Sequence, residues 1–277
     1  MTHQLEREKT TAVAAAQAAG TVIRAVYETK YRVDYKRNDS PVTVADRQAN
    51  HRIHQIIQHA FPHDGWLSEE TIDSPDRLSK RRVWVVDPLD GTKEFIDKVP
   101  EFAVSIGLIE DGQPLLGVIY YPALDELVWA ARDQGAWRRT GDTSDTRLRV
   151  SPTERLAEAT VLSSRSETKR GEWRPFQSLF RARPAGGMAH KLATVAKGEA
   201  DATFTLVPKN EWDLCAGAVL IEEAGGLLTT LGDKPVVFNQ ATTLLQGLVA
   251  SNRLLHPQLM AVVTPRLGQR HRAETRR

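Results

Sequence analysis

Small and apolar residues recur at helical spacing near the start of the chain. Residues 5–28 are rich in alanine and contain no proline, which predicts a helix. The polar segment 36–41 interrupts this pattern, and apolar residues then recur at helical spacing within 53–60, which predicts a second helix. Pro62 and Gly65 end it. We therefore expect two helices ahead of the first buried strand.

The middle of the chain reads as strands. Residues 83–86 form a short, mostly β-branched apolar run, which predicts a buried strand that ends at Asp87. Further apolar runs follow, separated by Asp111-Gly112 and by Pro122, and they predict an antiparallel meander. These runs are 102–109, 115–120 and 127–131.

The second half of the chain alternates short strands with helices, which is the pattern of an α/β fold. The expected strands are 161–163, 202–206 and 248–250, and the expected helices are 190–196 and 214–224. The pattern changes in the polar stretch 140–146. We therefore expect an α+β part with antiparallel strands over 1–145, an α/β part over 146–265, and a basic, disordered tail over 266–277.

Composition narrows the class of protein. Of 277 residues, 41% are hydrophobic and 26% charged, as in ordinary soluble proteins. The 37 basic and 35 acidic residues leave a net charge of +2, which argues against a dedicated nucleic-acid binder. The single cysteine, Cys215, excludes an intramolecular disulfide and a thiolate zinc site. With no long apolar run and no signal-peptide pattern, we expect a cytoplasmic protein.

The chemically unusual segment is 87–92, Asp-Pro-Leu-Asp-Gly-Thr, directly after the predicted buried strand. Pro88 stiffens the turn, so that Asp87 and Asp90 can aim oxygens into one small volume. A hard cation such as Mg²⁺ needs oxygens held in this way. A helix starting near Thr92 would add free amides that suit a phosphate. Two aspartates at this spacing alone more often mark a surface turn, but the preceding strand makes the motif more specific.

Two other acidic positions could complete a site. Glu69-Glu70 follows an apolar residue, although a glutamate pair alone is more often a solvated loop. Asp213 stands at the head of the predicted helix 214–224, where a plain N-cap is the simpler interpretation.

Together with Asp46, which follows Thr43-Val44-Ala45, these segments resemble the inositol monophosphatase superfamily over nearly the whole chain. The order is Asp46, Glu69-Glu70, the string 87–92, and Trp212-Asp213 leading to Ala224-Gly225-Gly226. The resemblance implies a layered α-β-α-β-α sandwich of mixed α+β and α/β class, as in inositol monophosphatases and fructose-1,6-bisphosphatases. It also implies a Mg²⁺-dependent phosphomonoesterase.

The resemblance further implies a set of metal ligands. Glu69, Asp87 and the Leu89 carbonyl would hold a first Mg²⁺. Asp87, Asp90 and Asp213 would hold a second, and Glu69 could reach a third, weaker ion. We therefore expect two to three Mg²⁺ ions per site, with Asp87 as the bridging ligand.

Catalytic roles follow from the same resemblance. Thr92, oriented by Asp46, would help to activate a water for attack on phosphorus, and Glu69 would take part beside them. The amides of Gly91 and Thr92 would bind the scissile phosphate. A small carboxylate cluster agrees with this scheme, because like charges repel strongly unless cations are bound.

The superfamily contains inositol monophosphatases, fructose-1,6-bisphosphatases, histidinol-phosphate phosphatases and 3′(2′),5′-bisphosphate nucleotidases. Lys93-Glu94-Phe95 and the stretches 186–201 and 207–213 are most similar to the last, CysQ-type branch, which cleaves adenosine 3′,5′-bisphosphate to AMP and phosphate. This implies a place in sulfur metabolism and inhibition by lithium. The alternatives are an inositol-1-monophosphatase or broad sugar phosphatase and, in another class, a non-catalytic phosphate-binding module.

A bisphosphate needs more cations than the metals supply, and Arg165, Lys191 and Lys209 could provide them. Each of these taken alone could also be an ordinary surface cation. The expected substrate-binding residues are Gly91, Thr92, Arg165, Gly187, His190, Lys191, Lys209 and Asp213. The expected partner is a small phosphate monoester, a nucleoside bisphosphate on this resemblance, with no nucleic-acid polymer and no membrane. Both a monomer and a homodimer remain open.

Overall fold

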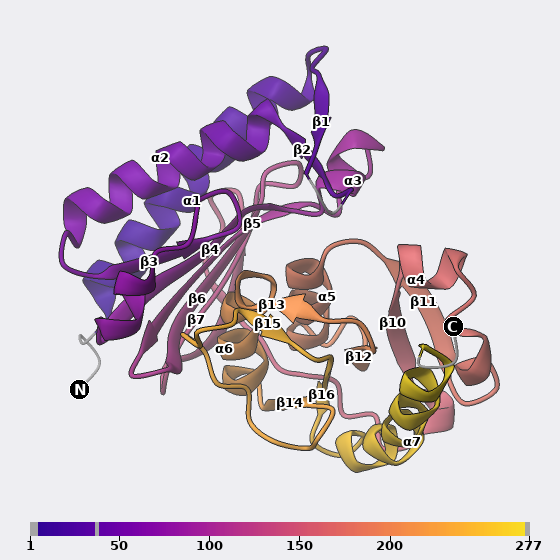
Figure 1. Ribbon diagram of the computed structural model, residues 1–277. Helices are drawn as coiled ribbons and strands as arrows, with labels where there is room; N and C mark the ends of the chain where they lie inside the picture. Colours follow the sequence, from indigo (N-terminus) through magenta and orange to yellow (C-terminus); the bar gives the residue numbers. More distant parts are fainter. Residues whose placement is uncertain (1–4, 37–38, 275–277) are drawn as a thin grey trace.

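The computed structural model describes residues 5–36 and 39–274, with side chains described as far as 265. Its helices and sheets stack in five layers, α-β-α-β-α (Figure 1). Helices α1 (Glu6–Tyr27) and α2 (Val44–Ala60) form the first layer, and α5 (Met188–Ala196) and α6 (Cys215–Glu223) lie between the two sheets. The expected layered sandwich is confirmed.

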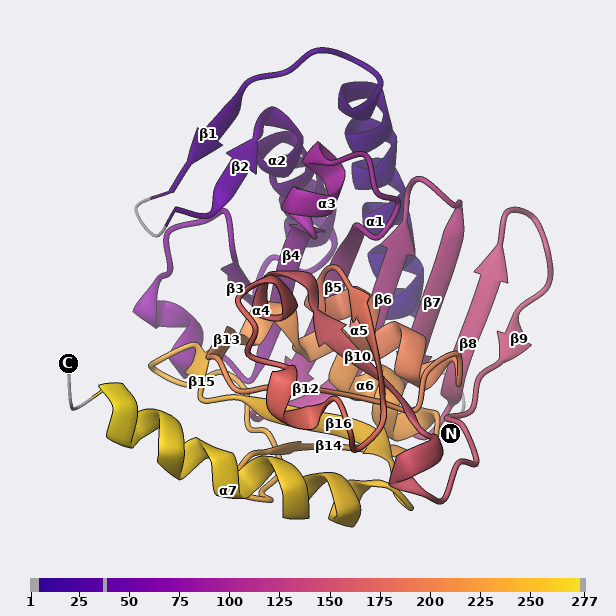
Figure 2. The same cartoon turned by 90° about the vertical axis from the view of Figure 1, so that its right-hand side faces the viewer.

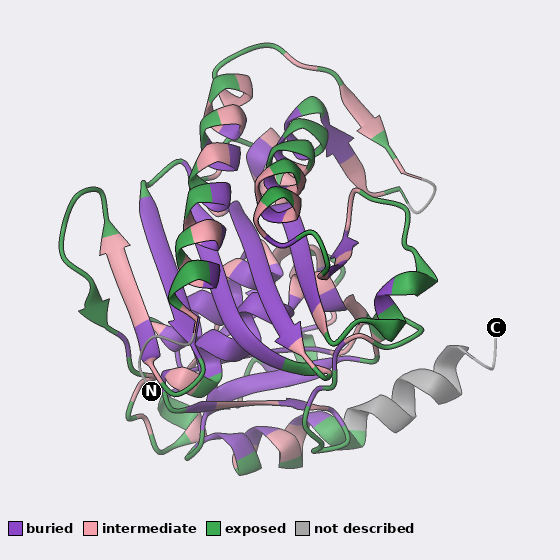
Figure 3. Ribbon diagram, turned by 90° about the vertical axis from the view of Figure 1, so that its left-hand side faces the viewer, coloured by how far each residue is buried: buried purple, intermediate pink, exposed green. Residues whose placement is uncertain are grey.

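The first sheet has seven strands in the order β3-β4-β5-β6-β7-β8-β9. Only β3 and β4 run parallel, and the other neighbours are antiparallel, so the expected meander is present with β8 and β9 added to it. The strands are β3 (Gly65–Ser68), β4 (Arg82–Asp90), β5 (Ala103–Glu110), β6 (Gln113–Tyr121), β7 (Glu126–Ala131), β8 (Gly135–Thr140) and β9 (Thr146–Arg147). Both faces of the central strands are buried (Figure 3), which explains their continuous apolar runs.

The second sheet has five strands in the order β11-β10-β12-β16-β14. Strands β11, β10 and β12 are parallel, whereas β16 is antiparallel to both of its neighbours. The bounds are β10 (Thr160–Ser164), β11 (Arg181–Ala185), β12 (Ala202–Thr205), β14 (Gly226–Thr230) and β16 (Leu248–Asn252). Helix α7 (His256–Glu274) covers the outer side of this sheet (Figure 2).

Short elements complete the fold. Strands β1 (Val33–Tyr35) and β2 (Pro41–Thr43) pair with each other, as do β13 (Lys209–Asn210) and β15 (Leu244–Leu245). The remaining helices are α3 (Thr92–Ile96), α4 (Arg165–Lys169) and the 3₁₀ turns Pro75–Ser79, Leu156–Glu158, Arg174–Phe176 and Glu211–Asp213.

Helix α6 packs very close to the first sheet, and this packing brings Asp213, which precedes the helix, toward β4. A Cβ added to Gly117 would lie 2.2 Å from the Ala216 carbonyl oxygen, and one on Gly107 would lie 2.4 Å from Cys215 Sγ. Larger residues on β5 and β6 would therefore push α6 outward. The two glycines let α6 pack close to the sheet, so that the turn Glu211–Asp213 ahead of it contacts β4.

One expectation about an element end was wrong. Strand β4 does not end at Asp87 but continues to Asp90, with an irregular register between these residues that accommodates Pro88. The backbone of α7 continues to Glu274, and residues 275–277 lie outside the described part, so the disordered tail expected over 266–277 stays a prediction. Packing of Leu259 and Val263 in the core of the second sheet stabilises this helix.

Among the described residues, no helix combines the length and the apolar character needed to cross a membrane.

Candidate active site

The two parts of the chain meet around a pocket with a volume of about 250 Å³. Its walls come from the ends of β3 and β4, the starts of α3, α4 and α5, and the segment before α6. Most of the expected site residues line it: Glu69, Asp87, Leu89, Asp90, Gly91, Thr92, Arg165, Gly187, Lys191, Lys209 and Asp213. Asp46 lies behind Thr92, and His190 does not line the pocket.

Asp87, Asp90 and Asp213 form a compact carboxylate cluster. One oxygen from each lies within 4.8 Å of the others. Burial, followed by the charges of Glu69 and Asp90, raises the pKa of Asp87 well above its usual value. Burial and the charge of Asp213 raise the pKa of Asp90 to about 7. Hard oxygen donors that repel one another in this way fit a divalent cation, which would relieve the repulsion.

Asp90 is held by the beginning of α5. Its Oδ1 accepts a hydrogen bond from Met188 N at 2.9 Å, and its Oδ2 accepts from Ala189 N at 2.9 Å and His190 N at 3.4 Å. Gly187, just ahead of the helix, has φ of 47°, and a Cβ there would lie 2.3 Å from Asp90 Oδ2. Glycine at 187 is therefore required for the carboxylate to reach the helix amides.

The other two aspartates are oriented locally. Asp87 Oδ1 accepts from Leu89 N at 3.0 Å, across the irregular end of β4. Asp213 Oδ2 accepts from Asn210 N at 2.9 Å, as part of a capping box around the Glu211–Asp213 turn. In both cases the amide donor lies two or three residues from the aspartate that it holds, so the local sequence determines the orientation of these carboxylates.

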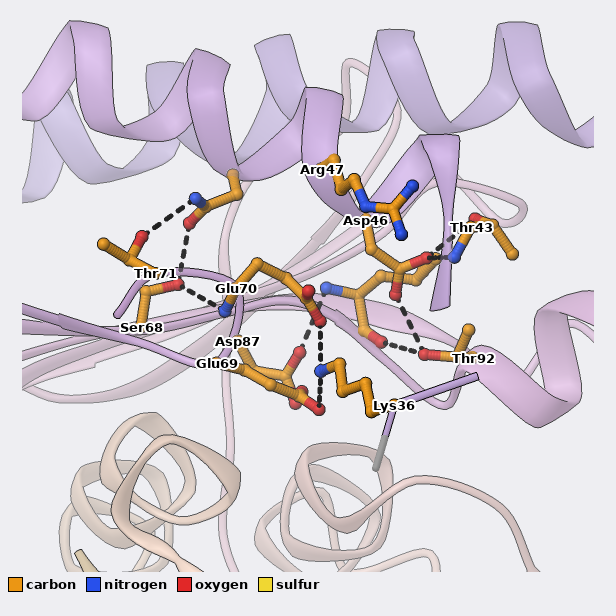
Figure 4. Close-up of polar contacts among 12 residues, drawn as sticks. Lys36, Thr43, Asp46, Arg47, Ser68, Glu69, Glu70, Thr71, Asp87 and Thr92 are labelled. Carbon is orange, nitrogen blue, oxygen red and sulfur yellow. Dashed lines mark hydrogen bonds and ion pairs between the residues drawn. The ribbon is translucent and has the colours of Figure 1, made fainter. Parts of the chain in front are cut away.

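Glu69 follows β3 and is close to the cluster, but its carboxylate is engaged by a residue that the sequence did not indicate. Lys36 Nζ donates to Glu69 Oε1 at 2.8 Å and also binds Glu70 (Figure 4). Burial raises the pKa of Glu69. The positive charge of Lys36 lowers this pKa, and the negative charge of Asp213 raises it further. Lys36 therefore compensates part of the negative charge that a cation would otherwise neutralise.

Thr92 and Asp46 form the second feature of the site. Thr92 Oγ1 donates toward Asp46 Oδ1 at 3.0 Å, with the Leu89 carbonyl oxygen at 3.2 Å as a second acceptor (Figure 4). Asp46 Oδ2 accepts from Thr43 N and Thr43 Oγ1, both at 2.7 Å, in the capping box of α2. Burial raises the pKa of Asp46, and these hydrogen bonds oppose the rise. The Asp46 carboxylate is thus fixed on both sides.

Arg165, Lys191 and Lys209 bring positive charge to the same pocket. Lys191 is buried, and burial together with the nearby Lys209 charge lowers its pKa to about 8. The pocket also contains Ser40, Glu94, Ser164 and Ser166, to which no binding role was assigned from the sequence. Glu94 was noted only as part of the Lys93-Glu94-Phe95 string, which resembles the CysQ-type branch.

The expected role of His190 in substrate binding does not agree with its position. Its ring packs edge-on against Tyr121, with 5.6 Å between the ring centroids, and away from the pocket lining. Burial lowers its pKa to about 3, so the ring is neutral at pH 7. Helical geometry explains the difference, because adjacent positions on α5 point to different sides and Lys191 takes the pocket side. Only the His190 backbone amide contributes, through Asp90.

The pocket combines buried carboxylates that suit a divalent cation with basic side chains that suit an anionic substrate. This combination is typical of a metal-dependent phosphatase. The model of the inositol monophosphatase family matches residues 4–267, and the chain belongs to this family. Its members are metal-dependent phosphatases.

Curated relatives and solved structures agree with this assignment. A fructose-1,6-bisphosphatase/inositol-1-monophosphatase of Aquifex aeolicus is 30% identical, covering 90% of this chain and 92% of the relative. The 3′(2′),5′-bisphosphate nucleotidase CysQ of Salmonella typhimurium is 36% identical, covering 76% and 85%. The crystal structure of CysQ from Bacteroides thetaiotaomicron matches with a TM-score of 0.76 and 28% identity, covering 90% and 98%. The named activities differ, so membership alone does not select a substrate.

Proposed function

We propose that the protein is a Mg²⁺-dependent 3′(2′),5′-bisphosphate nucleotidase that hydrolyses adenosine 3′,5′-bisphosphate to AMP and phosphate. The observation that carries this proposal is the placement of Arg165, Lys191 and Lys209 in one pocket with the aspartate cluster. A monophosphate needs only the metal site, whereas a second phosphate needs further cations within reach. The similarity to CysQ proteins supports the same substrate class.

The proposed Mg²⁺ ligands are Glu69, Asp87, the Leu89 carbonyl, Asp90 and Asp213. When bound, Mg²⁺ supplies charge neutralisation at the phosphate, a lowered pKa for the attacking water and stabilisation of the leaving oxygen. The residues of the chain hold the donors in place: β4 carries three of them, and the segments after β3 and before α6 carry the other two. Lys36 would compete with a cation for Glu69, because its ammonium group already binds that carboxylate.

Thr92 and Asp46 are proposed to orient the attacking water. Because the Thr92 hydroxyl donates its proton toward Asp46, its lone pairs remain free to accept a hydrogen bond from water. The amides of Gly91 and Thr92 border the same pocket and are the proposed donors to the scissile phosphate.

A substrate panel tests the proposal. Phosphate release in Mg²⁺ is measured from adenosine 3′,5′-bisphosphate, inositol 1-phosphate, fructose 1,6-bisphosphate and histidinol phosphate at equal enzyme concentration. We expect the nucleotide to have the highest kcat/KM, by about tenfold or more, because a second charge-assisted contact contributes about 1.5–3 kcal/mol. A higher kcat/KM for any other compound would show that the substrate assignment is wrong. No turnover of any of them would favour a non-catalytic phosphate-binding module.

Replacing Lys36 by methionine is expected to tighten Mg²⁺ binding about fivefold. The variant removes a positive charge that competes with the ion for Glu69, and a partly exposed ion pair contributes up to about 1 kcal/mol. Calorimetric Mg²⁺ titration measures the change. Lys93→Met is the matched control, because Lys93 borders the pocket but is exposed. Weaker Mg²⁺ binding in Lys36→Met than in the control would mean that Lys36 supports the site rather than competing for it.

A further inference from the structure

Glu101, in the loop before β5, contacts three separate segments of the pocket although it carries none of the roles described above. We infer that Glu101 is a positioning residue: it holds Arg165 where a second anionic group of the substrate is recognised, and so sets the preference for bisphosphates. This inference rests on the proposed function and names the residue that controls its specificity.

The side chain of Glu101 joins two segments of the C-terminal part. A single oxygen, Oε2, accepts from Arg165 Nη2 at 2.6 Å and from Gly186 N at 2.7 Å. Arg165 is the first residue of α4, and Gly186 belongs to the turn that leads into α5. Charge-assisted hydrogen bonds of this length are among the stronger polar contacts in proteins.

The backbone of Glu101 fixes the same residue against the metal loop. Its carbonyl oxygen lies close to both Gly91 and Gly187. A Cβ added to Gly91 would be 2.9 Å from this oxygen, and a Cβ added to Gly187 would be 3.4 Å from it. Gly91 precedes Thr92, and Gly187 precedes the amides that hold Asp90. The position of Glu101 is therefore set by the two glycine turns beside the carboxylate cluster, and the side chain transmits that position to Arg165.

The other carboxylates of the pocket explain why the contact between Glu101 and Arg165 matters. An arginine side chain has several rotatable bonds, and the pocket contains other carboxylates, such as Glu94, that would attract an untethered guanidinium. Glu101 occupies one nitrogen of the guanidinium, and no other hydrogen bond of this guanidinium is found among the described residues. The remaining N–H groups of the fork can therefore bind an anion from a defined position.

A double-mutant cycle tests the inference. The variants are Glu101→Gln, Arg165→Met and the combination, and the readout is the ratio of kcat/KM for adenosine 3′,5′-bisphosphate to that for inositol 1-phosphate. The glutamine oxygen can still accept from Gly186 N but no longer carries the charge that holds Arg165. We expect the ratio to fall about tenfold in Glu101→Gln and about 30-fold or more in Arg165→Met, mainly through KM of the bisphosphate.

In the Arg165→Met background, Glu101→Gln should change the ratio by less than about twofold, because its effect passes through Arg165. Glu158→Gln is the matched control, since Glu158 also pairs with an arginine, Arg155, but lies away from the pocket. A wild-type ratio near one would overturn the proposed substrate and the inference with it. A high wild-type ratio that survives in Glu101→Gln, or effects that simply add in the double variant, would overturn the inference alone.

Discussion

Replacing Asp87 by asparagine is expected to abolish activity while making the metal-free protein more stable. Asp87 is buried in the carboxylate cluster and is one of the proposed Mg²⁺ ligands. Loss of a metal that supplies several kcal/mol of transition-state stabilisation should lower kcat/KM by about 10³-fold or more. Asparagine keeps the oxygen that accepts from Leu89 N and turns an N–H group toward the neighbouring carboxylates.

The gain in stability should depend on pH with a definite sign. Asp87 and Asp90 have raised pKa values in the folded protein, so their protons stabilise the fold at acid pH. Between the unfolded carboxyl pKa, about 4, and the Asp90 value of about 7, the metal-free wild type loses stability as pH rises. Asp87→Asn removes part of this loss. Its advantage should therefore be larger at pH 7.5 than at pH 5.

Calorimetry in the presence of a chelator measures this effect. At pH 7.5 we expect a gain of about 1–2 kcal/mol, which for a chain of this size raises Tm by roughly 2–4 °C. Added Mg²⁺ should raise the Tm of the wild type and leave that of Asp87→Asn nearly unchanged. Near-normal turnover by Asp87→Asn would contradict the metal assignment.

Asp90→Asn provides a matched control in which the gain in stability should be absent. Both oxygens of Asp90 accept hydrogen bonds from amides of α5, so the asparagine NH₂ group would face a backbone donor. That mismatch costs about 1–3 kcal/mol and offsets the relief of repulsion. We expect Asp90→Asn to lose activity without any gain in Tm. An equal rise in both variants would show that repulsion alone governs the stability of the metal-free cluster.

Thr92→Val is expected to have the second largest effect, a fall in kcat of about 10²- to 10³-fold with little change in KM. Valine has nearly the same shape, so the loss reports the hydroxyl that is proposed to orient water. It also leaves Asp46 Oδ1 without the donor it has in the wild type. Steady-state kinetics on the best substrate of the panel measures both constants.

Thr43→Val separates this role from simple support of Asp46. Thr43 Oγ1 also donates to Asp46 and caps α2, but it does not border the pocket. We expect it to cost about 1–2 kcal/mol of stability, with less than a tenfold loss of kcat for the folded enzyme. If both variants lost activity equally, Thr92 would act only by holding Asp46.

The proposed metal ligands were anticipated from the sequence through the resemblance to one family, and part of their geometry is local. Asp87 and Asp90 lie on one strand end, and Asp213 is oriented by Asn210 three residues before it. The periodic apolar runs likewise predicted α1, α2, α6 and the meander, since those elements bury the faces that their patterns define. Motif order then restricted the chain to one superfamily.

Other parts of the site arise from contacts between distant segments. Asp90 is held by amides 98 and 99 positions away, Lys36 reaches Glu69 across 33 positions, and Arg165 reaches Glu101 across 64. Such contacts depend on how the two sheets and their helices pack, which no local pattern encodes.

The sequence by itself indicated the class of fold and the carboxylates and threonine of the proposed chemistry, because the order of its motifs resembles that of one superfamily. Only the tertiary structure decided which lysine and arginine side chains line the pocket and which residues hold them in position. It turned Lys191 toward the pocket and His190 toward Tyr121 on the same helix, and it placed Glu101 between the turn at Gly91 and Arg165. The physical reason is that side-chain direction and long-range charge pairing follow from packing, and packing is a property of the whole chain.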